Sequence, residues 1–217
     1  MQNLIRSIAF SCLVAVSFPA LADPVRDLVV AAQMDNATFA RKLISGGLSP
    51  NTIDPVSGEP VMLVALREGS ASVVDVLIAD PAFNLEMMAP NGNTALMMAA
   101  FKGNKRAVAG LLAKGAAVAR PGWNALHYAA AGGDTDIIKM LLDKKAPINA
   151  AAPGNMTALM MAAREGHEAA ALMLLREGAD GRLINNEHMN ASQIAAAKDF
   201  PRLAAAITTV LSTQGPR

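Results

Sequence analysis

The seven-residue phrase Thr-Ala-Leu-Met-Met-Ala-Ala occurs twice in this chain, at residues 94–100 and again at residues 157–163. Related segments with the same apolar pattern begin at residues 26, 60, 124 and 190. The six starting positions are therefore separated by 34, 34, 30, 33 and 33 residues. A period of this length along most of a chain is typical of a repeat architecture, in which each repeat is one small structural unit.

Each copy of the phrase continues in the same way. A turn residue follows it, then an amphipathic stretch such as residues 137–142, and then a second turn, as at residues 46–47, 115 and 178. The first turns are predicted at Asp35, Gly69, Gly103, Gly133, Gly166 and Asp199. This order indicates helix, tight turn, helix and loop. Because neither helix is long enough to be stable alone, each pair must pack against the next, and we expect an all-α solenoid.

The repeat resembles the ankyrin repeat, whose period is about 33 residues and whose signature is T-P-L-H-x-A. Asn124-Ala-Leu-His127 matches this signature best, and Gly166-His167, residues 178–180, Asn51 and Asn149 resemble other positions of the family. The resemblance covers residues 23–217 and implies about six helix-turn-helix units joined by short β-hairpin-like loops, with degenerate units at both ends. The units are expected to start near residues 24, 58, 92, 122, 155 and 188. The 30-residue step predicts that the loop at residues 120–122 projects less than the others.

The first 22 residues have the layout of a secretory signal peptide. One positive charge, at Arg6, precedes an apolar run at residues 8–18, which is too short to span a bilayer, and a small-x-small site ends at Ala22. A membrane anchor is the competing interpretation. We expect cleavage after Ala22 and a periplasmic location, although full secretion is also compatible with the sequence. Cleavage would remove Cys12, the only cysteine.

Composition and motifs exclude several functional classes. Without Arg6, the chain has 18 basic and 18 acidic residues, so no bulk charge favours nucleic acid or an anionic membrane. No nucleophile elbow, zinc-binding helix or phosphate-binding glycine loop occurs, and we expect no catalytic residue, no metal and no cofactor. The family resemblance implies that His127 and His167 are structural, with His127 connecting a loop to the first helix of its unit. An enzyme with an unrecognised groove is a minor alternative.

The paired methionines of the repeated phrase allow three interpretations. Met97 and Met160 occupy the position of the family histidine, and packing by a flexible thioether is the favoured explanation. A site for monovalent copper is a second possibility, although the chain has no Met-x-x-Met run. Thirdly, Met34, Met156 and Met189 could form an adaptable surface for a protein partner.

The resemblance implies that a partner protein binds a concave face built from loop tips and first helices. Trp123, Phe101 and Tyr128 form the best candidate patch, because interface hot spots favour large aromatic side chains. Further candidates at equivalent positions of other units are Met34, Arg67, Glu68, Asn93, Lys102, Met156, Arg164 and Glu165.

These observations predict a non-catalytic, monomeric protein-binding module of the bacterial periplasm. Bacterial proteins that resemble this chain are associated with catalase function and oxidant defence, so an envelope enzyme such as a catalase is one expected partner. The alternative is an immunity protein that neutralises a periplasm-acting toxin. A methionine-based metal-binding protein is less favoured.

Overall fold

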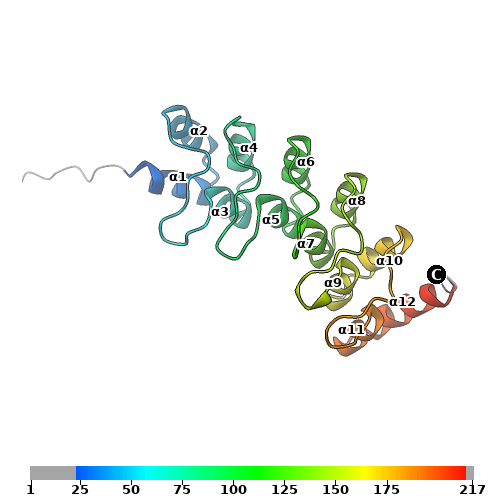
Figure 1. Ribbon diagram of the computed structural model, residues 1–217. Helices are drawn as coiled ribbons and strands as arrows, with labels where there is room; N and C mark the ends of the chain where they lie inside the picture. The colour runs from blue at the N-terminus through cyan, green and yellow to red at the C-terminus, as the bar shows by residue number, and fades with distance from the viewer. Residues whose placement is uncertain (1–22, 214–217) are drawn as a thin grey trace, which may run out of the picture.

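The computed structural model describes residues 23–213, which form six consecutive pairs of α-helices (Figure 1). The first helices of the pairs are α1 (Pro24–Gln33), α3 (Val61–Glu68), α5 (Ala95–Phe101), α7 (Ala125–Gly132), α9 (Ala158–Arg164) and α11 (Ala191–Ala197). The second helices are α2 (Ala37–Ser45), α4 (Ala71–Ala79), α6 (Lys105–Ala113), α8 (Thr135–Asp143), α10 (Glu168–Arg176) and α12 (Pro201–Thr213). A short 3-10 helix, η1 (Pro153–Asn155), lies in the connection between α8 and α9.

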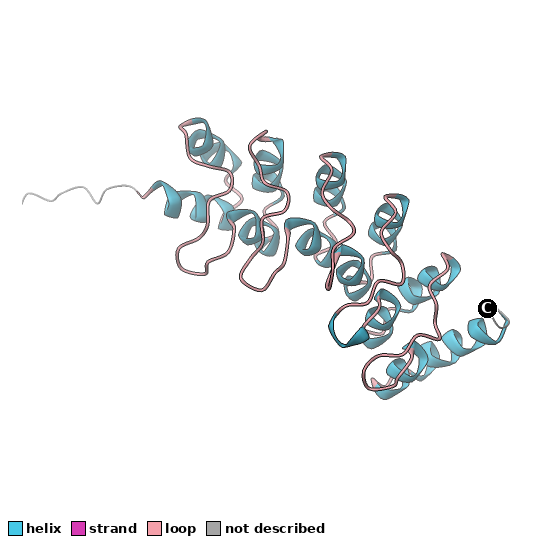
Figure 2. Ribbon diagram, in the orientation of Figure 1, coloured by secondary structure: helices cyan, strands magenta, loops and turns pink. Residues whose placement is uncertain are grey.

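The pairs stack side by side in one curved array. Figure 1 shows the first helices in one row and the second helices in another, with the two ends of the array far apart. Each first helix contacts the first helix of the next unit, as α5 contacts α7 and α7 contacts α9. Figure 2 shows the described residues as helices and loops, with the long loops between units on one side of the array. The predicted all-α solenoid is therefore confirmed.

The turn inside every helix pair contains one residue in the left-handed conformation. The φ angles are 51° at Asp35, 76° at Gly69, 68° at Gly103, 77° at Gly133, 76° at Gly166 and 64° at Asp199. Glycine adopts this conformation without steric cost, and aspartate is among the residues that tolerate it. The six turn positions expected from the sequence are all confirmed.

Replacing Gly133 by alanine is expected to destabilise the stack more than replacing Gly69. Both positions have nearly the same φ, so both variants carry the same backbone strain of about 1–2 kcal/mol. A Cβ atom on Gly133 would lie only 2.6 Å from Nδ1 of His167, whereas a Cβ on Gly69 meets nothing within 4 Å. Urea unfolding followed by circular dichroism measures the difference, and equal losses in the two variants would contradict this account.

The core runs the length of the array between the two rows of helices. Leu96, Leu126 and Leu159, at the third position of the repeated phrase, are each 1% exposed. Met97 and Met160 are also buried, which confirms packing as their role. The alanines of the phrase are buried as well and allow the first helices to approach closely.

Hydrogen bonds within and between the loops hold the connections between units. Antiparallel bridges join Ile53 to Pro60, Met88 to Thr94 and Ala152 to Met156, so three of the described connections are hairpin-like. Residues 114–124, between α6 and α7, form the shortest connection and have no such bridge. This short loop is instead held by Arg120, whose guanidinium donates to Glu86 at 2.5 Å and to the sulfur of Met88 at 3.2 Å.

The expected signal peptide at residues 1–22 lies outside the described residues, and so does the end of the chain from residue 214. Among the helices of residues 23–213, none combines the length and the apolar character that a membrane span requires.

Candidate protein-binding face

Three aromatic side chains from two neighbouring units form a cluster, called here the aromatic patch: Phe101, Trp123 and Tyr128. Phe101 is the last residue of α5, Trp123 precedes the N-cap of α7, and Tyr128 lies on α7. The ring centroids of Phe101 and Tyr128 are 6.3 Å apart with an interplanar angle of 89°, and those of Trp123 and Tyr128 are 6.4 Å apart at 70°. These edge-to-face arrangements are the ones that aromatic pairs prefer. The structure thus brings together the three residues that the sequence singled out.

Tyr128 fixes the orientation of the patch. Its hydroxyl donates a hydrogen bond of 2.5 Å to Oδ1 of Asn93, which belongs to the preceding unit. Burial raises the pKa of the Tyr128 phenol, although the bond to Asn93 acts in the opposite direction, so the hydroxyl remains a donor at neutral pH. Phe101 is 48% exposed, while Trp123 and Tyr128 are half-buried. The patch is therefore held in place but still accessible.

Two hollows adjoin the aromatic patch. The first, called the aromatic hollow, has a volume of about 310 Å³ and is lined by Phe101, Trp123, His127, Tyr128, Ala131, Met161, Arg164 and Glu165. The second, called the methionine hollow, has a volume of about 410 Å³. It is lined by Trp123, Pro153, Gly154, Met156, Arg164, Asn185, Asn186, Glu187, Met189, Ile194, Ala197 and Lys198. Trp123 and Arg164 line both hollows, so these two side chains mark the boundary between them.

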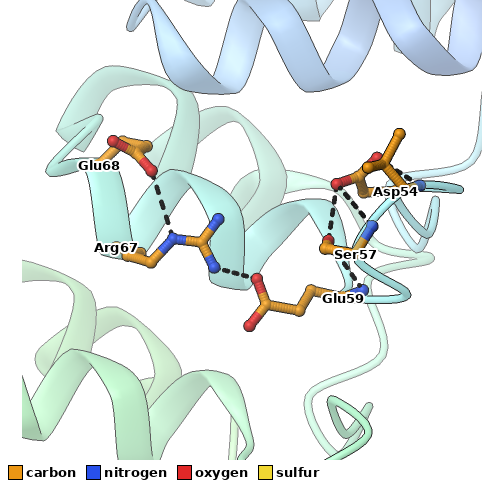
Figure 3. Close-up of polar contacts among 6 residues, drawn as sticks. Asp54, Ser57, Glu59, Arg67 and Glu68 are labelled. Atoms are coloured by element: carbon orange, nitrogen blue, oxygen red, sulfur yellow. Dashed lines mark hydrogen bonds and ion pairs between the residues drawn. The ribbon is translucent and has the colours of Figure 1, made fainter.

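Arginine–glutamate pairs occupy equivalent positions in the second and fifth units. Arg164 donates from Nε to Glu165 at 2.9 Å, and Arg67 donates from Nε to Glu68 at 3.3 Å. Figure 3 shows that Arg67 also bonds to Glu59, and this bond raises the pKa of the Arg67 guanidinium. The charges at these positions are therefore compensated within the chain.

The hairpin beside Arg67 is stabilised by a buried carboxylate. Asp54 accepts a hydrogen bond of 2.6 Å from the hydroxyl of Ser57, together with backbone bonds from Val56 and Ser57 (Figure 3). These bonds favour the charged form and lower the pKa of Asp54. Since Asp54 is satisfied by its own turn, it belongs to the scaffold of the loop.

Comparison with known proteins shows what this repeated architecture is. A family model described as "Ankyrin repeats (3 copies)" matches residues 28–121 and 117–185. The chain belongs to the ankyrin repeat family.

Similar ankyrin repeat proteins match different fractions of this chain. The Notch-regulated ankyrin repeat-containing protein of Homo sapiens is 36% identical over 86 residues, which is 37% of this chain and 75% of that protein. The SH3 and multiple ankyrin repeat domains protein 1 of Homo sapiens is 32% identical over 140 residues, 62% of this chain but 6% of that protein. The crystal structure of the ankyrin repeat domain of Bcl-3, a member of the IkappaB protein family, matches with a TM-score of 0.68 and 25% identity. That match covers 84% of this chain and 81% of the Bcl-3 chain.

His127 connects the fourth ankyrin unit to the loop that follows it. The imidazole is 1% exposed, and its Nε2 lies 3.0 Å from the carbonyl oxygen of Ala150 and 3.1 Å from that of Met156. Because both neighbours are acceptors, Nε2 carries the proton and donates, while Nδ1 accepts from the backbone N–H of Asn124 at 3.3 Å. The structural role implied by the resemblance is confirmed for this residue.

Acidification is expected to weaken the stack partly through His127. Burial is the main cause that lowers the pKa of this imidazole in the folded chain, whereas the unfolded side chain titrates near 6.5. The unfolded state then binds more protons below pH 6.5, so this stabilising contribution is present above pH 6.5 and is lost as the pH falls. Unfolding free energies at pH 7.5, 6 and 5 measure the effect.

The matched variant is His127→Met, since Met97 and Met160 occupy the same position in the neighbouring units. Its stability should be lower by about 1 kcal/mol at neutral pH, because the hydrogen bond to the loop is lost. Its loss of stability between pH 7.5 and pH 5 should be smaller than that of the wild type. An identical pH dependence would show that His127 does not contribute.

The structure separates the predicted binding residues into two groups. Seven surround the two hollows or support their walls: Asn93, Phe101, Trp123, Tyr128, Met156, Arg164 and Glu165. Four do not line either hollow, namely Met34, Arg67, Glu68 and Lys102, and all four side chains are exposed. Met34, which is 77% exposed, lies at the N-terminal end of the array. The surface thus concentrates on the third to sixth units.

Several lining residues were missed by sequence reasoning. Met161 could have been found, because it occupies the position that Tyr128 holds in the preceding unit. Ile194 had the same signal, since it occupies the position of Tyr128 and Met161 in the sixth unit. Lys198 likewise occupies the position of Glu165. In residues 23–213, no group of three or more histidine, cysteine, aspartate or glutamate side chains is arranged to hold a metal ion.

Proposed function

We propose that this ankyrin repeat protein is a non-catalytic module that captures a partner protein, as a monomer, through the aromatic patch and its two hollows. The distribution of aromatic residues carries this proposal. Residues 23–217 contain six aromatic side chains, Phe39, Phe83, Phe101, Trp123, Tyr128 and Phe200. Three of these six, including the only Trp and the only Tyr, gather in one accessible patch.

Physical reasons favour a binding role for such a patch. A folding requirement would place large aromatic rings in the core, but Phe101 is 48% exposed and Trp123 is half-buried. Partly exposed, oriented Trp and Tyr side chains supply most of the energy at many protein interfaces. Ankyrin stacks are generally protein-binding modules, and their concave face lies on the side formed by loops and first helices.

We place this activity in the bacterial periplasm, on the basis of the signal-peptide layout of residues 1–22. A partner in the cell envelope follows from that location. The favoured partner class is an envelope enzyme such as a catalase, which this chain would support in oxidant defence. A periplasm-acting toxin, neutralised by this chain as an immunity protein, is the second.

The test is affinity capture with the mature chain, residues 23–217, immobilised and exposed to a periplasmic extract of the source organism. We expect one or a few proteins to be retained and identified by mass spectrometry, and the wild-type precursor to yield a mature protein that begins at Asp23. Retained activity against hydrogen peroxide indicates an enzyme of the catalase class, whereas a retained protein that kills cells lacking this chain indicates a toxin. The proposal would be overturned if no protein is specifically retained. It would also be overturned if the purified chain turns over a substrate.

A further inference from the structure

We infer that the partner presents the uncharged, apolar face of an α-helix, with one apolar side chain in the aromatic hollow and another, seven residues along, in the methionine hollow. This inference rests on the proposed function and adds the chemistry and the secondary structure of the bound segment. Three observations carry it: the lining of the hollows, the pairing of charges around them, and the spacing of the helices that form them.

Apolar surface exceeds polar surface in both hollows, by a wide margin in the aromatic hollow and by a small one in the methionine hollow. Phe101, Trp123, Tyr128, Ala131 and Met161 line the aromatic hollow. Met156, Met189, Ile194, Ala197 and Pro153 contribute to the methionine hollow. Thioethers adapt their shape to whatever apolar group packs against them, so the second hollow accepts side chains of several sizes. An apolar side chain that enters either hollow is removed from water, which is the main source of binding energy at such sites.

The charged groups around the hollows cancel. Four charged residues line them, the cations Arg164 and Lys198 and the anions Glu165 and Glu187. Arg164, at the boundary, already donates to Glu165 at 2.9 Å. A strongly acidic or basic segment would therefore find no net charge of opposite sign. Binding that depends on apolar contact is expected to change little with ionic strength, since there is little net charge to screen.

The distance between the two hollows fits a helix better than a strand. The aromatic hollow lies over α7 and α9, and the methionine hollow lies over α9 and α11, so the two are one unit step apart. Packed helices are about 8–10 Å apart. Residues i and i+7 of a helix face the same side and are separated by about 10.5 Å along its axis. Same-face residues of a strand are about 6.8 Å apart at i and i+2 and about 13.6 Å apart at i and i+4, so they fall short of or exceed one unit step.

The experiment uses the single tryptophan as the reporter, because Trp123 lines both hollows. Short alanine-based helical peptides without Trp serve as probes, with leucine at i and i+7. The comparison peptides carry leucine only at i, leucine at i and i+5 on different faces, or glutamate or lysine at both positions. Each peptide is titrated into the mature chain, residues 23–217, at about 0.05 M and about 0.5 M salt.

We expect the peptide with leucines at i and i+7 to bind about tenfold more tightly than the peptide with one leucine, at both salt concentrations. Phe101→Ala and Met189→Ala should each remove the advantage of the second leucine, because each opens one hollow. Val56→Ala, at a 93% exposed hairpin residue that lines neither hollow, is the matched control and should keep that advantage. Circular dichroism checks that all three variants are folded.

Tighter binding of the glutamate or lysine peptide, equal binding of the i+5 peptide, or no response of Trp123 to any peptide would overturn the inference. The capture experiment distinguishes this failure from failure of the proposed function. If a partner protein is retained while no leucine peptide binds, the binding module stands and only the chemistry assigned to its partner is wrong.

Discussion

The double variant Phe101→Ala with Trp123→Ala is expected to lose the captured partner while its far-UV circular dichroism spectrum stays that of the wild type. Neither side chain belongs to the fully buried core, since Phe101 is 48% exposed and Trp123 is half-buried. Removing hot-spot aromatic residues costs at least about 2 kcal/mol of binding energy, which corresponds to a loss of about thirtyfold in affinity. The amount of partner retained per folded molecule is the measured quantity.

A suitable control for this variant is Val56→Ala, which removes apolar surface from a 93% exposed position outside both hollows. It should retain the partner fully. If the double variant also retains the partner, the aromatic patch is not the binding site, even if the chain is a binding module. Loss of helical signal in the double variant would instead indicate that the aromatic rings are part of the scaffold.

The variant Leu126→Ala is expected to lose about 2–5 kcal/mol of unfolding free energy, the range observed when a buried leucine is truncated. Leu126 is 1% exposed and lies on α7, which packs against α5 on one side and α9 on the other. A cavity there weakens two contacts between units at once, and the stability of a stacked array depends on such contacts. Leu159→Ala, on α9, should behave similarly. Urea unfolding followed by helical signal measures both.

Leu183→Ala is the matched control for the buried leucines. It is the same chemical change at a side chain that is 37% exposed in the loop before α11. Its expected cost is within about 0.5 kcal/mol, as for most surface substitutions. Equal losses at Leu126 and Leu183 would argue against a core that runs continuously between the units.

Much of the fold follows from patterns that act over short distances in the chain. The turn after each repeated phrase was predictable because Gly133 and its counterparts occupy a position where L side chains are disfavoured. The buried leucines were predictable because apolar residues at helical spacing must face a neighbouring unit. The same period, applied to Tyr128, predicts that Met161 faces the same surface in the next unit.

The candidate site was predictable only in part. The repeat placed Phe101, Trp123 and Tyr128 on one face. It could not predict the hydrogen bond from Tyr128 to Asn93 or the one from Arg120 to Glu86 in the short loop. Neither could the repeat show that Trp123 and Arg164 separate two hollows. Ile194 and Lys198 occupy the positions of Met161 and Glu165 in the sixth unit, so the repeat pointed to them although they were not predicted.

By itself, the sequence determined the class of architecture, the helix pairs and their turns, because these depend on periodicity and local conformational preference. Only the tertiary structure decided which candidate residues share a surface and which, like Met34, lie apart from it. The reason is physical: periodicity fixes the direction of a side chain within its own unit, while the distance between side chains of different units depends on how closely neighbouring helices pack and on the loops that connect them.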